Sequence, residues 1–240
     1  MARGTKDANS GNKMKLLGVE TSSPIFSVAV SDGPKILAYL QVDGQGRPSS
    51  LLTDLIEQAL KEAGVALPEL NGLAISIGPG SFTGLRIGVM TVKTLAWALK
   101  KPVLPVSSLE VVAQNMPLDV PNIYPFLDAR RGNVYTARFC RDGGGTLRRA
   151  GPDELLHPEE ALRKVEPPAH LVGDGLKRYA ELVDSLSLRE VQQAPASLWV
   201  PRADRACRIA SAAWPAGIVD DPHPLVPQYL YSKEGGITAR

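Results

Sequence analysis

The stretch Gly78-Pro79-Gly80-Ser81-Phe82-Thr83-Gly84-Leu85-Arg86-Ile87-Gly88 stands between an apolar segment over 73–77 and a long amphipathic segment over about 85–100. Glycine adopts backbone conformations that other residues resist, so the composition predicts a tight turn from a strand into a helix. A helix N-terminus of this kind can bind an anion, but the spacing matches neither GxxxxGK[ST] nor GxGxxG. We favour a structural connection in which Ser81 or Thr83 caps the helix and Gly88 permits close packing. The loop residues assigned to it are Gly78, Gly80, Ser81, Thr83 and Gly84.

Three strands and a helix are predicted before this turn. Alternating apolar residues indicate strands over 16–20, 25–31 and 36–42, the last two joined by Asp32-Gly33-Pro34. Apolar residues at helical spacing indicate a helix over 52–63, with Ser49 or Ser50 as its cap and Gly64 at its end. The order is strand, strand, strand, helix, strand, helix.

The same order recurs in the second half of the chain. Strands are predicted over 123–129, over 134–140, near Leu147 and over 169–172, with helices over 158–165 and 176–183. Two copies of a βββαβα unit predict an α/β protein with a duplicated, two-lobed actin-like fold (ASKHA, ribonuclease H-like), in which mixed sheets are flanked by helices.

The predicted units divide the chain into four parts. Residues 1–14 form a flexible leader, because they are polar and without periodicity, and the folded protein is expected to begin near Met14. Residues 15–107 form the N-terminal lobe and residues 108–222 the C-terminal lobe. Residues 223–240 form a tail, extended by its prolines, that packs back on the first lobe.

Composition excludes several classes of protein. Lys and Arg number 27 against 25 Asp and Glu, which does not resemble a strongly basic nucleic-acid binder. Arg202, Arg205 and Arg208 lie on one side of a predicted helix, and we favour a solvated basic face over an RNA site. The chain has no apolar run of the roughly 20 residues that span a bilayer and no secretion signal. With two cysteines and no CxxC motif, a cytoplasmic protein that does not contact membranes is expected.

The residues offer no complete catalytic, cofactor or metal site. The three histidines are far apart in the sequence and none has a second ligand at helical spacing. No GxSxG motif supports a serine nucleophile, and Glu110 and Asp128 are single carboxylates. Glu20 follows the first strand, but Pro24 removes a backbone donor from its turn, so Glu20 is interpreted as capping its own turn. We therefore assign no catalytic, cofactor-binding or metal-binding residue.

The helix after the glycine-rich turn is apolar on two sides. One stripe faces inward, while Met90 and Trp97 lie on another face beside Lys93. That second face suits either a subunit interface or burial in a three-layer core. We predict an interface, because charged residues interrupt the apolar surface and exposed Trp and Met are frequent interface anchors. The predicted interface residues are Leu85, Arg86, Val89, Met90, Lys93 and Trp97.

Several segments together resemble one known family. They are LLGVETSSPIFSVAV (16–30), GPGSFTGLRIG (78–88), PVLPVSSLEVVA (102–113), FLDARRGNVYTARF (126–139) and the ending PLVPQYLYSKE (224–234). They closely resemble the bacterial TsaB family, formerly called YeaZ. The resemblance covers residues 15–140 well, and between 141 and 222 it is one of layout only.

The resemblance implies an actin-like fold and a part in installing threonylcarbamoyladenosine (t6A) beside the anticodon of tRNA. It implies a non-catalytic scaffold subunit that supports the catalytic relative TsaD, together with the ATPase TsaE. TsaD has two metal-binding histidines just after a Pro-Val pair, and the corresponding positions here are Ser108 and Val112. ATP and a divalent metal are therefore expected on the partner subunits and not on the isolated chain.

The resemblance also implies a homodimer when the chain is alone, use of the first-lobe helices in both associations, and contact with tRNA through the complex. The resemblance places Asp in many relatives where this chain has Glu20, which argues against nucleotide binding by the first lobe. One alternative is an ATP-dependent small-molecule kinase or transferase of the actin-like superfamily. Another is a protease acting on TsaD, for which the residues offer no recognisable machinery.

Overall fold

The computed structural model describes residues 14–44, 48–185, 189–214, 216 and 221–231. Met14 is buried beside the first strand. The leader expected before Met14, the side chain of Ser49 and the tail beyond Tyr231 lie outside the described residues. The other expected cap, Ser50, lies within the helix that begins at Pro48 and not before its start. Within the described ranges, no helix is both long enough and apolar enough to cross a membrane.

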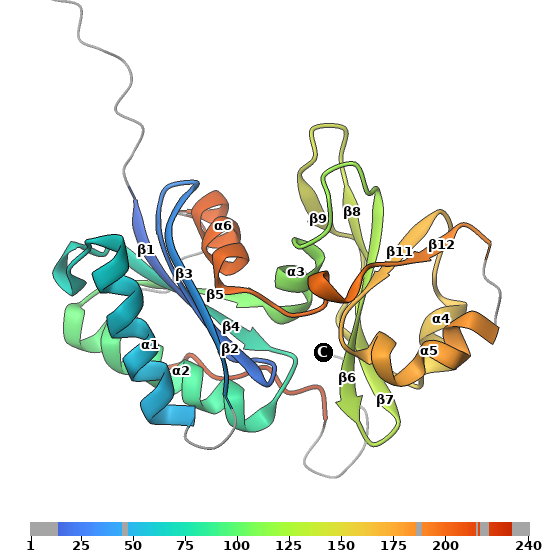
Figure 1. The fold of residues 1–240 in the computed structure, drawn as a ribbon, viewed down its shortest axis with the longest axis horizontal. Coiled ribbons are helices and arrows are strands. Elements are labelled where there is room, and N and C mark those ends of the chain that lie inside the picture. Colours follow the sequence, from blue (N-terminus) through green and yellow to red (C-terminus); the bar gives the residue numbers. More distant parts are fainter. Residues whose placement is uncertain (1–13, 45–47, 186–188, 215, 217–220, 232–240) are drawn as a thin grey trace, which may run out of the picture.

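The first lobe is built on a five-stranded mixed sheet (Figure 1). Its strands are β1 (Lys15–Glu20), β2 (Ile25–Asp32), β3 (Lys35–Asp43), β4 (Gly72–Gly78) and β5 (Val103–Ser107). They lie in the order β3-β2-β1-β4-β5. The pairs β1–β2 and β2–β3 are antiparallel, while β1–β4 and β4–β5 are parallel. One face is covered by α1 (Pro48–Ala63) and α2 (Phe82–Leu99), and the other by α6 (Ala203–Ala213).

The second lobe is built on a seven-stranded sheet. Its strands are β6 (Asn122–Arg130), β7 (Asn133–Thr136), β8 (Phe139–Arg141), β9 (Leu147–Arg149), β10 (Glu154–Leu156), β11 (Ala169–Val172) and β12 (Val191–Gln193). The main order is β10-β7-β6-β11-β12, with the β8–β9 hairpin attached to β6. Helices α4 (Pro158–Arg163) and α5 (Gly175–Ser185) pack on one face, and α3 (Ser108–Ala113) packs on the other. Two short 3-10 helices are η1 (Leu67–Glu69) and η2 (Ala196–Leu198).

The two sheets confirm the predicted duplication. Strands β1, β2, β3, β4 and β5 match β6, β7, β10, β11 and β12 in order and direction. The strand predicted near Leu147 exists as β9, but it forms a hairpin with β8. The place equivalent to β3 is taken by the three-residue strand β10, which the periodicity did not indicate.

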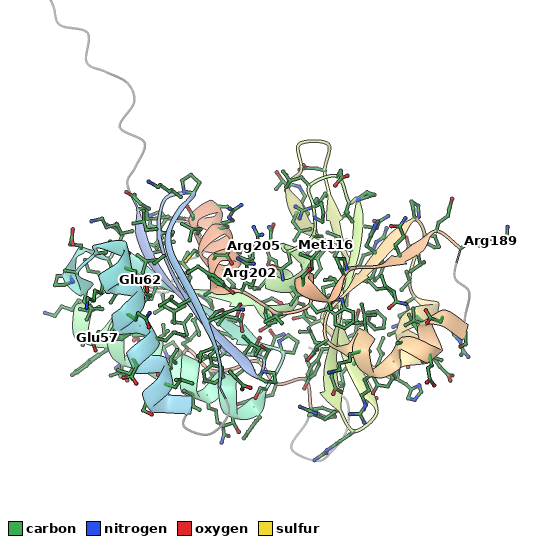
Figure 2. The ribbon with its side chains drawn as sticks, in the orientation of Figure 1. Glu57, Glu62, Met116, Arg189, Arg202 and Arg205 are labelled. Atoms are coloured by element: carbon green, nitrogen blue, oxygen red, sulfur yellow. The ribbon has the colours of Figure 1, made fainter. Side chains whose placement is uncertain are left out.

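The helix α1 shows how periodicity placed the first-lobe elements. Leu52 and Ala59 are fully buried in the core, while Glu57 and Glu62 lie on the exposed side (Figure 2). Gly64 ends the helix with a φ of 64°, and its N–H donates to the carbonyl oxygen of Lys61 at 3.1 Å. Gly64 therefore stops the helix as the sequence predicts.

The third helix of each unit packs against the core of the other lobe. Helix α3 follows the last strand of the first sheet but buries Leu109 and Val112 in the core of the second lobe. Helix α6 follows the last strand of the second sheet but buries Ala203 and Cys207 against the first sheet. Sequence order assigned α6 to the C-terminal lobe over 108–222. Its contacts differ from that assignment, because its small apolar residues fit the open face of the first sheet.

The C-terminal tail runs along α2 and then crosses to the second lobe. Leu225 joins the first-lobe core and Leu230 joins a second-lobe core. Between them, the N–H of Gln228 donates to the carbonyl oxygen of Ile77 in β4 at 2.7 Å, and its side-chain amide donates to Asp153 at 3.0 Å. The described part of the tail thus ties both lobes together.

Candidate functional site: an exposed helix face and an interlobe cleft

The glycine-rich loop packs closely against the turn that follows β1. The N–H of Ser81 donates to the carbonyl oxygen of Ser22 at 2.7 Å. A Cβ at Gly80 would collide with that carbonyl, and a Cβ at Gly84 would collide with the carbonyl oxygen of Thr21. The loop glycines therefore serve close packing between two turns.

The start of α2 is capped by Ser81 and not by Thr83. The Ser81 hydroxyl accepts a hydrogen bond from the N–H of Gly84 at 3.3 Å. Thr83 is exposed and lines the cleft between the lobes. Gly78 has a φ of 122°, and its Cα faces the carbonyl oxygen of Gln228 in the tail. The five loop residues thus divide into a cap, three glycines in close packing and one exposed threonine.

Glu20 lies wholly inside the protein. One carboxylate oxygen accepts the N–H of Ser22 at 2.6 Å, and the other accepts the hydroxyl of Ser76. Burial raises the pKa of Glu20, although the hydrogen bonds from Ser22 and Ser76 oppose that shift. Both oxygens are engaged by the protein, in accord with a carboxylate that caps its own turn.

A cleft of about 850 Å³ separates the lobes. The first lobe lines it with residues 22–25 and 80–83, and the second with the end of β6 and the start of α5. Asp128 lies 3.4 Å from Arg178 and 3.6 Å from Arg130, measured from carboxylate oxygen to guanidinium nitrogen. Burial raises the pKa of Asp174, which accepts the N–H of Asp128 at 3.0 Å. The Asp128 carboxylate is therefore already paired with cations of the chain.

The positions that correspond to metal-binding histidines lie in α3. Ser108 and Val112 are both fully buried, and Val112 packs in a second-lobe core. Glu110, on the same helix, is partly buried, and burial raises its pKa while Arg149 opposes the shift. In the part of the chain that the structure describes, no three His, Cys, Asp or Glu side chains lie together as they would around a metal ion.

The outer face of α2 carries the most prominent exposed apolar side chains of the first lobe. Trp97 is 68% exposed, Met90 is 59% exposed and Phe82 is 52% exposed. With Arg86 and Lys93, they follow the spacing i, i+4, i+8, i+11 and i+15, which places all five on one side of the helix. We call these five residues the α2 stripe.

The structure separates the six predicted interface residues into three groups. Leu85 and Val89 are buried against the sheet and cannot reach a partner without unfolding. Lys93 is engaged by the tail, because its Nζ donates to the carbonyl oxygens of His223 at 2.7 Å and Leu225 at 3.0 Å. The remaining three, Arg86, Met90 and Trp97, are exposed.

Sequence reasoning missed two parts of this surface. Phe82 stacks on Tyr229 of the tail with ring centroids 5.0 Å apart. The Arg86 guanidinium lies over the Phe82 ring at 3.7 Å and donates to the Tyr229 hydroxyl at 3.2 Å. The spacing of Phe82 from Arg86 and Met90 signals its place on the stripe, whereas the tail residue could be placed only from the fold.

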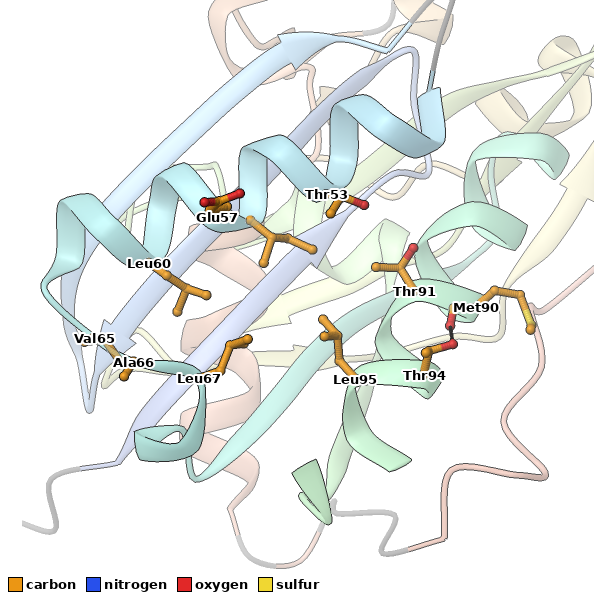
Figure 3. A pocket seen from close by; sticks show the side chains of 11 residues that line it. Thr53, Glu57, Leu60, Val65, Ala66, Leu67, Met90, Thr91, Thr94 and Leu95 are labelled. Carbon is orange, nitrogen blue, oxygen red and sulfur yellow. Dashed lines mark hydrogen bonds between the residues drawn. The ribbon is translucent and has the colours of Figure 1, made fainter. Parts of the chain in front are cut away.

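The second missed feature is an apolar groove of about 780 Å³ between α1 and α2 (Figure 3). Leu60, Leu67 and Leu95 point into the space between the helices, and Met90 stands at the border with the α2 stripe. The groove extends the exposed apolar surface from α2 toward α1. Such continuous surfaces are typical of protein interaction sites.

Comparison with known proteins shows which family this architecture resembles. A family model described as TsaD, tRNA N6-adenosine threonylcarbamoyltransferase, matches residues 47–187. The tRNA threonylcarbamoyladenosine biosynthesis protein TsaB of Bacillus subtilis is 29% identical over 220 residues, covering 90% of this chain and 94% of that protein.

Solved structures agree with the sequence comparison. YeaZ from Pseudomonas aeruginosa superposes with a TM-score of 0.78 at 30% identity, covering 90% of this chain and 100% of that one. Component A of the (R)-2-hydroxyglutaryl-CoA dehydratase of Acidaminococcus fermentans shares the fold alone, with a TM-score of 0.51 at 10% identity over 83% of this chain and 98% of that one. The fold is the actin-like one that the repeated strand order predicts. From the YeaZ structure, the TsaB relative and a family model that matches more than half of the chain, we conclude that this chain belongs to the TsaB/YeaZ family.

Proposed function

We propose that this chain is a non-catalytic scaffold subunit in the synthesis of t6A, and that it supports a TsaD-like catalytic subunit in threonylcarbamoyl transfer. The observation that carries the proposal is the exposure of Trp97 and Met90 beside an apolar groove, on a chain of the TsaB/YeaZ family. Exposure of large apolar side chains to water is unfavourable, and a partner that covers them lowers the free energy of the system.

The α2 stripe has the composition of an interface core. Trp, Met and Arg are enriched where partners bury surface, and a few central anchors carry most of the binding free energy. Phe82 and Tyr229 hold each other in place, and Arg86 is held against both. A surface arranged before binding loses less conformational entropy when a partner docks.

One face can serve two associations at different times. In this proposal the stripe and the groove form a homodimer when the chain is alone and dock the TsaD-like subunit when it is present. A TsaE-like ATPase joins the assembly, and tRNA is bound through the complex. ATP and a divalent metal belong to the partner subunits, and the assembly works in the cytoplasm.

The internal geometry supports a non-catalytic role. Ser108 and Val112 stand where TsaD is expected to carry histidines, and both are buried away from the cleft. Glu20 has both oxygens engaged by Ser22 and Ser76. A hydroxyl and an alkyl group cannot replace imidazole ligands.

A second candidate is an ATP-dependent kinase or transferase, and the interlobe cleft of about 850 Å³ favours it. Pockets between two lobes are common ligand sites. Against it, the first-lobe wall offers a turn whose Pro24 lacks an N–H, and Asp128 is paired with Arg178 and Arg130. The scaffold role therefore has the better support.

A reconstituted modification assay tests the proposal. Purified TsaD-like and TsaE-like subunits are mixed with tRNA, with and without this chain, and t6A is measured in the digested RNA. We expect modification to require the chain, and the chain alone to produce none. Equal modification without the chain, or modification by the chain alone, would contradict the proposed role.

A further inference from the structure

The helix α6 turns a group of arginines toward the second lobe. Figure 2 shows Arg202 and Arg205 on the side of α6 that lies toward Met116, which follows α3 in the chain. Residues 202–213 contain three arginines and a single carboxylate, Asp204. The local charge is positive although the whole chain is nearly neutral.

Asp204 cannot neutralise the arginines around it. Arg202 forms two hydrogen bonds with its carboxylate, at 2.9 and 3.3 Å. Arg205 reaches the same carboxylate only at 3.8 Å, and its Nε is buried without a hydrogen-bond partner. Arg208 is exposed and forms no ion pair with the described residues. One carboxylate is thus shared between Arg202 and Arg205, and Arg208 has no ion pair among the described residues.

A fourth arginine comes from the second lobe. Arg141 in β8 donates to the carbonyl oxygens of Gly145 at 2.9 Å and Met116 at 3.0 Å, so its position is fixed. Its Nε is buried without a partner. Burial and then the nearby Arg205 guanidinium lower the pKa of Arg141, which agrees with two like charges held close across the lobe junction.

Partly buried cations of like sign raise the free energy of the folded chain unless an anion joins them. Arginine pairs best with phosphate or carboxylate through two parallel hydrogen bonds. Arg202 is also stacked over the Tyr39 ring at 4.5 Å, so an aromatic group lies beside the charges. These features together fit a nucleic-acid backbone better than a single small ion.

Charge patterning favoured a solvated face for Arg202, Arg205 and Arg208, but two of them are partly buried beside a fourth arginine. We propose instead that these three residues, with Arg141 behind them, form a surface that binds the phosphate backbone of RNA. Over Arg202 to Arg208 the helix rises by roughly 9 Å, which spans two to three phosphates at about 3.4 Å per nucleotide along a helical strand. This inference rests on the proposed function, in which tRNA is the substrate of the assembly. It gives this chain a direct part in holding that tRNA.

Fluorescence anisotropy with a labelled tRNA transcript tests the surface on the purified full chain. Arg208→Glu changes an exposed residue, and Arg205→Gln/Arg208→Glu extends the change to the partly buried one. Arg163→Glu in α4 is the matched control, since that residue is exposed on another helix. Circular dichroism establishes that each variant is folded, and Arg208→Glu alone decides the matter if the double variant does not fold.

We expect Arg208→Glu to weaken tRNA binding about fivefold and the double variant more than tenfold, with the salt slope reduced by about one to two. Arg163→Glu should change affinity less than about twofold. Unchanged affinity in Arg208→Glu, an equal loss in Arg163→Glu, or no measurable binding by the parent chain would overturn the assignment. Displacement of the labelled tRNA by polyglutamate at lower concentrations than by unlabelled tRNA would indicate an acidic protein partner instead and would also overturn it. No TsaD-like subunit is present in this assay, so its failure is distinguishable from failure of the modification assay.

Discussion

The carbonyl oxygen of Thr21 lies so close to the Cα of Gly84 that a Cβ at position 84 would overlap it. This contact presses the first turn of α2 against the turn after β1. Gly80 makes an equivalent approach to Ser22. The position of α2, and with it the α2 stripe, depends on these two backbone contacts.

Gly84→Ala should therefore destabilise the protein by about 1–3 kcal/mol, because the added methyl group meets backbone and not a flexible side chain. Gly143→Ala is the control, since a Cβ there meets no atom within 4 Å. It should change the free energy of unfolding by less than about 0.5 kcal/mol. Urea denaturation measures both variants, and equal stabilities would show that the turns can move apart freely.

Glu20→Gln should reveal the cost of burying a carboxylate. Because the pKa of Glu20 is raised by burial, the folded chain binds more protons than the unfolded chain between the two pKa values, and its stability falls as pH rises through that window. Gln does not titrate, so the variant does not lose stability in this way as the pH rises. Its stability relative to the parent should rise as the pH increases above the usual pKa of a glutamate, about 4.3, by at most about 1.4 kcal/mol per pH unit.

Denaturation at several pH values measures this difference, with Glu57→Gln on the exposed side of α1 as the control. A stability difference for Glu20→Gln that stays constant with pH would mean that the Glu20 carboxylate is ionised at no cost.

Ser108→Ala and Glu110→Ala should each leave t6A formation by the assembly intact apart from modest losses. Ser108 is buried and its hydroxyl has no hydrogen-bond partner among the described residues, so its removal deletes no contact that holds the fold. The reconstituted modification assay measures the effect. Complete loss of transfer in a variant that still folds and assembles would place catalytic chemistry in this chain.

Isothermal titration with ATP and Mg²⁺ should show no micromolar binding to the isolated chain. The oxygens of Glu20 are engaged by Ser22 and Ser76, and Asp128 is paired with Arg178. A dissociation constant near 1 μM corresponds to a binding free energy of about −8 kcal/mol. The Glu20 and Asp128 carboxylates already have partners within the chain, so they are not arranged to contribute to it. Micromolar binding would favour the kinase alternative.

Sequence patterns predicted the first lobe well because its elements are long and regularly periodic. Gly64 and Ser81 marked a helix end and a helix start correctly. The strands β10 and β12 have only three residues each, too few for a period to be read. Their positions depend on pairing with β7 and β11, which are distant in sequence.

The candidate site was predicted only in part. Helical spacing placed Met90 and Trp97 on an outward face, and both are exposed. The same reasoning could not show that Lys93 is held by the tail or that Leu67 joins a groove with α2, because those contacts join distant segments. The crossing of α3 and α6 likewise depends on which sheet faces remain open, which local patterns do not encode.

Docking of the TsaD-like subunit on the α2 stripe can be measured by co-elution of the purified proteins on size exclusion chromatography. Trp97→Glu should remain folded by circular dichroism, because Trp97 is 68% exposed, and should weaken both self-association and TsaD binding by more than about 2 kcal/mol. Leu118→Glu is the control, since Leu118 is 73% exposed outside the stripe and should leave both associations unchanged. Docking on the stripe predicts that the parent and Leu118→Glu co-elute with the TsaD-like subunit, whereas Trp97→Glu does not. Co-elution of folded Trp97→Glu with undiminished affinity would contradict it, as would a parent chain that binds no TsaD-like subunit under any nucleotide condition.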